Sequence, residues 1–411
     1  MCGEIWSPYT LFKKLFKLAP HFVTLAATLD STAAWARINY ALKMANNKCT
    51  ACHLASAGAG PKTLNGKLYG AREWAMHPFL RQSYAGADVK FLYLDPTQKQ
   101  DETRSGLMNM ATNIWASVPI TPEEGDQGLR IVAEQNFSSA ATTTARNLYL
   151  RWAPTDETGT SWLPQYIFLG RFLPPFGIVT DEHDTYVRMQ TGTMWNFGLR
   201  MGALFSANPV DSIHYDIALL NGQQNTGTLV AGEAAMWGTV LNLRWMPSTL
   251  PFLIGASASY YSPAPNSYDR SAQSVYFGLS FERLTGQRVP VQLLAEYAVA
   301  RNWNSLIPGS FATADYLSQN AQADSVGGLT EIDWDLNLKT TLIAKYDYLL
   351  LNKGFSGDAF QKYSLGVKRW FGPNLWFMVR YDKAVANKPE ERDTGFLGSN
   401  SIFWTLLSVQ L

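Results

Sequence analysis

The sequence predicts an all-β fold, a transmembrane antiparallel β-barrel of about 14 to 16 strands that follows a short, partly helical segment. Three observations lead to this fold class. Apolar and polar residues alternate along many short segments, these segments often carry an aromatic residue at one or both ends, and the chain ends inside such a segment at 401–411. Alternation gives a strand one lipid-facing and one lumen-facing side, and aromatic ends suit the two membrane interfaces.

The composition agrees with a barrel and excludes other classes. The chain has 411 residues, a formal net charge of +1, 16% charged residues and 13% aromatic residues. Because phosphate binding requires a basic surface, we expect no nucleic-acid partner. Spanning by a helix requires about 20 consecutive apolar residues, and no such run follows residue 36. A soluble β-sandwich is the alternative, since alternation alone is typical of any half-buried sheet, but it would need neither aromatic ends nor an export signal.

Residues 1–36 are predicted to be a signal peptide, which would direct the protein through the periplasm to the outer membrane. A basic region at 13–17 precedes a short apolar run at 22–29, and Ala34-Trp35-Ala36 has the small-x-small pattern of a cleavage site. The alternative is an amphipathic helix of a cytosolic protein. Cleavage after Ala36 would remove one of the three cysteines and leave Cys49 and Cys52.

Cys49-Thr50-Ala51-Cys52-His53 has the pattern of a covalent attachment site for one c-type haem. The two thiols can add to the two vinyl groups of one porphyrin, and His53 follows as the proximal ligand of the haem iron. With 3 Cys and 5 His in the chain, an accidental match is rare. A redox-active cysteine pair would be expected near a βαβ pattern, and a zinc site would require a distant fourth ligand. A plain disulfide is the third alternative.

The distal ligand of the iron is predicted to be His77, with Met76 as the alternative. The two residues are adjacent, so only one of them can serve. A methionine would give a higher reduction potential than a second histidine. Met44, Met108 and Met110 are also available.

The predicted domains are a haem-binding segment at 37–104 and the barrel at 105–411. Helical fragments are expected at 36–46 and near 68–80, and we expect the segment to lie in or against the periplasmic mouth of the barrel as a partial plug. In the barrel, Asn221-Gly222 and Gly372-Pro373-Asn374 are predicted to be tight turns. The polar stretch from Pro308 to Leu329 is predicted to be an extracellular loop.

Charged residues of both signs are predicted on the lumen-facing side of the strands, as in a salt-bridged lumen that is either filled with water or plugged. His214 alternates inward with Asp216, and His183 lies in the acidic stretch 181–184. A lumenal His beside an Asp can be a proton or metal site, but simple polar lining is the favoured interpretation. The other candidates for this face are Arg130, Glu134, Arg151, Arg171, Arg200, Arg244, Glu296, Lys368 and Arg380.

The organisation resembles a known family. A short segment with one Cys49-x-x-Cys52-His53 site, followed by an outer-membrane barrel, is similar to the monohaem cytochrome–porin fusions of iron-oxidising bacteria. The resemblance implies an iron:cytochrome oxidoreductase type of electron transfer, with Cys49, Cys52 and His53 as the haem site and no matching iron-binding residue. Residues 170–188 are also similar to a segment of outer-membrane barrels from metal-respiring bacteria.

Three functional hypotheses follow. The first is an outer-membrane electron conduit between an extracellular donor or acceptor, such as ferrous iron, and a periplasmic carrier such as a soluble cytochrome. A bilayer core of about 30 Å is too thick for efficient tunnelling, so a haem would have to be carried into it. The second is a diffusion porin with a plug-like N-terminal segment and a structural or absent haem. The third is a haem-bearing subunit that docks to a multihaem cytochrome.

Overall fold

In a computed structural model of the chain, one closed antiparallel barrel is formed by sixteen strands, the upper end of the predicted range. The structure describes residues 84–96, 106–121, 128–138, 141–153, 160–178, 185–193, 198–221, 237–247, 252–262, 269–281, 291–303, 322–337, 339–355, 359–371, 375–387 and 401–410. The strands are β1 (Tyr84–Pro96), β2 (Gly106–Pro119), β3 (Gly128–Ser138), β4 (Ala141–Ala153), β5 (Tyr166–Phe172), β6 (Arg200–Val210), β7 (Ile213–Asn221), β8 (Trp237–Trp245), β9 (Phe252–Tyr261), β10 (Arg270–Ser280), β11 (Val291–Arg301), β12 (Asp324–Asn337), β13 (Thr340–Leu350), β14 (Ala359–Trp370), β15 (Leu375–Ala386) and β16 (Ser401–Gln410).

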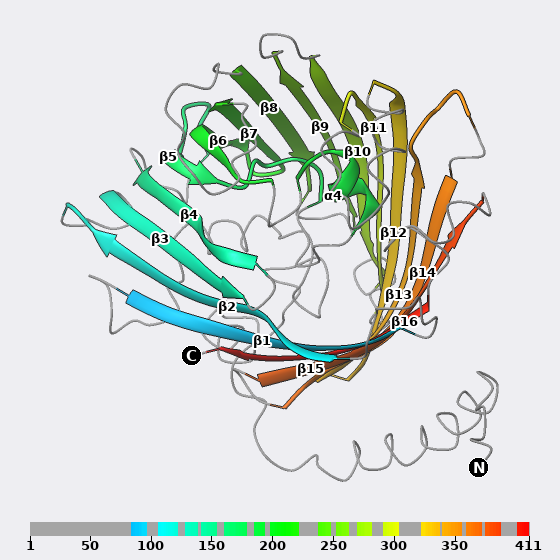
Figure 1. The fold of residues 1–411 in the computed structure, drawn as a ribbon. Coiled ribbons are helices and arrows are strands. Elements are labelled where there is room, and N and C mark those ends of the chain that lie inside the picture. The colour runs from blue at the N-terminus through cyan, green and yellow to red at the C-terminus, as the bar shows by residue number, and fades with distance from the viewer. Residues whose placement is uncertain are drawn as a thin grey trace, which may run out of the picture.

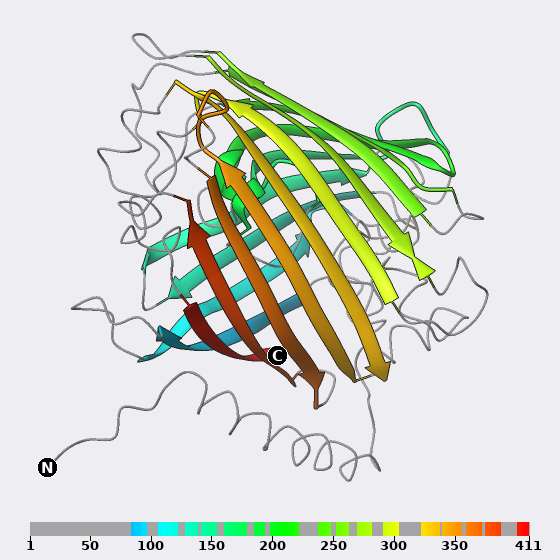
Figure 2. The same ribbon diagram turned by 90° about the vertical axis from the view of Figure 1, so that its right-hand side faces the viewer.

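Each strand pairs with its sequence neighbours, and β1 pairs with β16 to close the ring, with Val89 opposite Val409. The two ends of the barrel differ (Figures 1 and 2). Short connections such as 211–212 and 338–339 lie at one end, which we call the turn end, and long connections such as 302–323 and 387–400 lie at the other, the loop end. The first residues of β1 and the last residues of β16 are both at the turn end.

Strand β8 shows why these sequences form a membrane barrel. Its alternate residues from Trp237 to Trp245 are exposed and point outward, whereas Val240 and Asn242 between them are buried. A tryptophan therefore stands at each end of an apolar outer stripe, as expected for a strand that meets lipid and both interfaces. The same outward exposure recurs on other strands, including Leu107, Trp152, Val275, Trp334 and Leu365.

Three predicted boundaries differ from the structure. Strand β1 lies within 37–104, so the barrel begins at Tyr84 rather than at residue 105; residues 91–94 are apolar on both faces, which hides the alternation. The predicted loop 308–329 is wrong at its end, because β12 begins at Asp324. Asn221 ends β7 and pairs with Trp237, the first residue of β8. Because 15 residues connect the two strands, the predicted tight turn at Asn221-Gly222 does not join them.

Other predictions fall outside the described residues, among them the signal peptide 1–36, the helical fragments at 36–46 and 68–80, and the turn at 372–374. In the described part of the chain, no helix is long and apolar enough to cross a membrane.

A charge at the centre of the outer face is expected to destabilise the barrel much more than one at its edge. Leu241 lies in the middle of β8 and Trp237 at its end, and both point outward. The introduced charge should lower the free energy of unfolding by about 2–4 kcal/mol in Leu241→Arg and by about 0–1 kcal/mol in Trp237→Arg. Denaturant unfolding in lipid vesicles measures both, and equal losses would contradict the placement of Leu241 at the membrane centre.

Candidate functional site

The predicted lumen-facing charges are on the inner face of the barrel, with one exception. Arg171 on β5 stands opposite Leu148 and Met201, which lie on the outward face, so the strand's own alternation turns it away from the lumen. Its neighbours Gly170 and Phe172 take the inward positions. The remaining candidates are buried or half-buried along the inner wall: Arg130, Glu134, Arg151, Arg200, Arg244, Glu296, Lys368 and Arg380.

The connection from β5 to β6 folds into the barrel instead of closing a simple hairpin. We call its described parts, 173–178 and 185–193, the inward segment. Its helix α4 (Tyr186–Gln190) lies inside the ring of strands beside β11, β12 and β13 (Figure 1). All five residues of α4 are buried. The segment therefore occupies part of the lumen on one side.

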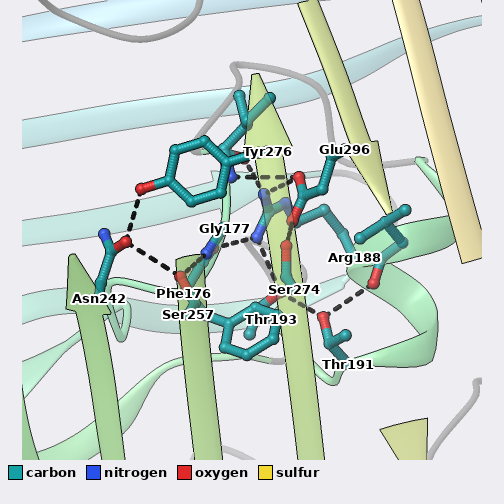
Figure 3. A network of polar contacts seen from close by, with 12 residues as sticks. Phe176, Gly177, Arg188, Thr191, Thr193, Asn242, Ser257, Ser274, Tyr276 and Glu296 are labelled. Atoms are coloured by element: carbon teal, nitrogen blue, oxygen red, sulfur yellow. Dashed lines mark hydrogen bonds and ion pairs between the residues drawn. The ribbon is translucent and has the colours of Figure 1, made fainter. Parts of the chain in front are cut away.

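An ion pair joins the inward segment to the barrel wall (Figure 3). Arg188 Nη2 lies 2.9 Å from Glu296 Oε2 on β11, and both side chains are almost fully buried. The same carboxylate accepts hydrogen bonds from the Ser274 hydroxyl at 2.7 Å and from the backbone N–H of Ile178 at 3.1 Å. The Arg188 guanidinium also donates to the backbone carbonyls of Phe176 and Ile178. One carboxylate thus binds two separate stretches of the segment.

Gly177 fits the chain closely against this ion pair. Its φ of +62° is a conformation that side-chain-bearing residues rarely adopt. A Cβ atom at this position would lie 1.9 Å from Glu296 Oε1. The backbone N–H of Gly177 donates to the Ser257 hydroxyl on β9 at 2.9 Å. A glycine is therefore required for the backbone to approach the wall here.

The helix makes further contacts with the wall. The backbone N–H of Tyr186 donates to Asp347 Oδ1 at 3.3 Å, and Lys362 Nζ lies 3.6 Å from Asp347 and 5.1 Å from the Tyr186 ring. Gln190 donates to the Ala298 carbonyl at 3.4 Å. A Cβ atom on Gly327 of β12 would lie 2.1 Å from Gln190 Oε1. The helix therefore lies directly on the backbone of the strands.

An apolar cluster secures the other side of the segment. Phe176 from the segment and Phe172 from β5 pack with Tyr261, the last residue of β9, and with Trp303, two residues after the end of β11. Gly192, with a φ of +62°, lies so close to the Trp303 ring that a Cβ atom would be 2.3 Å from it. Burying these aromatic rings stabilises the folded-in position by roughly 1.5–3 kcal/mol for each fully buried side chain. The segment is thus a packed part of the barrel.

The predicted His214 lies in a polar cluster on β6, β7 and β8. Its Nε2 is 3.1 Å from Ser206 Oγ and 2.8 Å from Asp216 Oδ1, and its Nδ1 is 2.6 Å from Asn208 Oδ1. Arg244 lies 2.9 Å from the second oxygen of Asp216. Ser, His and Asn are arranged as in a nucleophilic triad. However, Ser206 is fully buried and also contacts Asp216, so a substrate carbonyl cannot reach it. The cluster fits the favoured interpretation of polar lining.

The predicted haem residues cannot be placed, because Cys49, Cys52, His53, Met76 and His77 lie outside the described residues. The same holds for Met44 and His183. Within the described ranges, no group of three or more His, Cys, Asp or Glu side chains is arranged to hold a metal ion.

The sequence did not identify the contacts that hold the inward segment. Arg188, Ser257 and Ser274 have no pattern that marks them, since the contacts described above join them to residues 10 to 108 positions away. One signal was present, however. The 27 residues between Phe172 and Arg200 are too many for a simple hairpin loop, and they contain Pro174-Pro175 and three glycines.

Comparison with known proteins supports the fold. No protein-family model matches the chain, and no curated protein matches it in sequence. OprB of Pseudomonas putida is similar in structure, with a TM-score of 0.58, 9% identity, and 84% of this chain and 96% of that one covered. OmpF of Salmonella typhi has a TM-score of 0.56 and 12% identity, and the match covers 80% of this chain and 97% of that one. An anion-selective porin from Comamonas acidovorans has a TM-score of 0.55 and 9% identity, and the match covers 80% of this chain and 99% of that one.

At these identities the structural similarity shows the fold alone. The two faces of the barrel indicate the environment in which it lies. A closed sheet with an apolar outer band and a polar inner face is suited to a lipid bilayer. The predictions of a transmembrane antiparallel β-barrel of about 14 to 16 strands and of an outer-membrane location are therefore confirmed, whereas the predicted helical segment lies outside the described residues. The chain is a 16-stranded outer-membrane β-barrel with the fold of the porins.

Proposed function

We propose that the protein is a diffusion channel for small hydrophilic solutes across the outer membrane. The observation that carries this proposal is the inward segment, which is anchored through Arg188 and Glu296 on one wall and so narrows the lumen of a closed barrel. A 16-stranded barrel encloses a wide lumen unless something fills it. The solved structures that it resembles include an outer-membrane channel and an anion-selective porin.

The charges on the inner wall support a polar route. Cations such as Arg130 and Arg151 lie directly opposite one another on β3 and β4, and carboxylates such as Asp333 and Asp335 lie on β12. A wall that carries charges of both signs favours the passage of hydrated solutes over apolar ones. Because bacterial barrels have short periplasmic turns and longer extracellular loops, we place the turn end in the periplasm and the loop end outside the cell.

Flux of uncharged sugars into lipid vesicles tests this function. The folded full-length protein should admit small sugars and exclude larger ones, since the anchored segment fixes the width of the route. A folded barrel that admits sugars of every size equally would contradict a role for the inward segment.

A second function has one specific observation in its favour, the Cys49-x-x-Cys52-His53 motif. We propose that it binds one covalent haem c, with His53 as the proximal ligand and His77 or Met76 as the distal one. The donor set fits this group, since two thiols at this spacing and a following imidazole are what covalent haem attachment requires. When bound, the haem would supply one-electron transfer. The protein would then pass electrons between an extracellular donor or acceptor, with ferrous iron as a candidate, and a periplasmic carrier or a multihaem cytochrome.

A further inference from the structure

A second apolar region of the inner wall lies on strands β1, β2, β14, β15 and β16. Leu92 on β1 stands opposite Leu406 on β16 and Met108 on β2, and Leu406 stands opposite Met378 on β15. These positions share the lumen side, because Arg380 and Asp382 two and four residues further along β15 are buried inside the barrel. We call this region the lumenal apolar patch; its members are Leu92, Leu94, Met108, Met110, Trp370, Trp376, Met378, Trp404 and Leu406.

The patch runs diagonally along the inner wall from the turn end toward the loop end. Trp370 is the last residue of β14, and Trp376 is the second residue of β15, so both lie at the turn end. Leu94 and Met108 lie near the loop end of β1 and β2. Large apolar patches facing water are costly and usually mark a binding surface. Six members of the patch, including Met108, Met378 and Trp404, are only partly buried.

Two further features suit an occupant. The indole N–H of Trp404 is shielded from water but has no hydrogen-bond partner among the described residues. Cations stand at the rim: Lys368 Nζ lies 4.3 Å from the Trp376 ring, and the Arg380 guanidinium 5.1 Å from the Trp404 ring. The surface therefore combines indoles and thioethers with positive charge.

We propose that the lumenal apolar patch is the docking site of residues 37–83 of this same chain. These residues join the barrel at Tyr84, the first residue of β1, and β1 is itself part of the patch. They therefore arrive at the turn end, where the patch begins. Leu92 is eight residues further along β1, or about 26 Å into the barrel. The 32 residues from Cys52 to Tyr84 span about 48 Å even as a continuous helix, so the chain is long enough to reach it.

The chemistry of residues 37–83 fits the patch. Around Trp74 the segment carries Leu68, Tyr69, Met76 and Phe79, which can cover apolar wall. If the segment carries a haem, as proposed above, the apolar face of the macrocycle suits the methionines and tryptophans.

Photo-cross-linking in the full-length protein tests the docking. Met378 and Met108 are each replaced by benzoylphenylalanine, and the neighbouring outward residues Val379 and Leu107 serve as matched controls on the same strands. After irradiation and protease digestion, mass spectrometry identifies the joined peptides. The two lumenal positions should cross-link to peptides from 37–83, and the two outward positions should not.

Two outcomes would overturn the proposal. One is cross-linking of the lumenal positions to the loop-end connections 97–105 or 387–400 instead of 37–83. The other is an absence of cross-links from both lumenal positions in a folded protein with the photoprobe incorporated. The readout needs neither haem nor solute flux, so the docking can fail while either proposed function holds, and the reverse.

Discussion

The single-channel conductance is expected to rise when Glu296 is replaced by alanine. Glu296 binds Arg188, the Ile178 N–H and Ser274, so its removal leaves a buried guanidinium without its carboxylate. Breaking a buried ion pair from one side typically costs about 3–5 kcal/mol. That cost falls on the folded-in position of the inward segment, because the barrel strands keep their own backbone pairing. Release of the segment widens the lumen and adds fluctuations to the current.

Two variants distinguish release of the segment from a change of lumen charge. Glu331→Ala removes a carboxylate from β12 that lies 3.7 Å from Lys345, and it should change ion selectivity more than conductance. The double change Arg188→Met with Glu296→Leu removes both charges and fills the space with apolar side chains, so it should restore much of the wild-type conductance. Equal conductance in Glu296→Ala and wild type would show that the ion pair does not hold the segment.

Covalent haem is expected to be lost entirely when Cys52 is replaced by alanine. The motif requires both thiols at their spacing, and haem staining of the denatured protein with intact-mass measurement reports the covalent bond directly. Cys2→Ala is the matched control, because Cys2 lies in the predicted signal peptide and should leave staining unchanged. An unstained wild-type protein, produced in cells that attach haem to other proteins, would contradict the haem proposal.

The same variant separates the two proposed functions. Solute flux should be unchanged in Cys52→Ala, because the inner wall and the inward segment do not include the motif. Reduction of an external acceptor through vesicles that hold the protein should be abolished. Loss of flux together with haem would instead indicate that the haem segment is needed to fold or open the barrel.

The fold was predictable from the sequence because the alternation of residues is local. Along β8 and β13 each side chain points to lipid or lumen according to its parity, so the sequence alone identifies the strand and its faces. Strand β1 was not predicted, because this alternation is absent from it. Its residues Leu92 and Leu94 face the lumenal apolar patch, so both faces of the strand are apolar and the alternation disappears.

The site was much less predictable, because it depends on contacts between distant parts of the chain. The sequence placed Glu296 on the lumen side but gave no partner for it, since Arg188 lies 108 residues away in a connection rather than a strand. Arg171 shows the opposite error. A charged residue in a strand suggests the lumen, but the register of β5 turns this one outward. The motif at 49–53 is the converse case, a local pattern whose chemistry needs no fold to be recognised.

Planar-bilayer recording of the purified wild-type protein tests most directly whether the barrel conducts solutes past the anchored inward segment. The protein must first be shown to be folded, for example by heat-dependent migration in gels. We expect discrete, stable conductance steps from the wild-type protein and larger steps from the Glu296→Ala variant. A folded, inserted wild-type protein that passes no ions would contradict it.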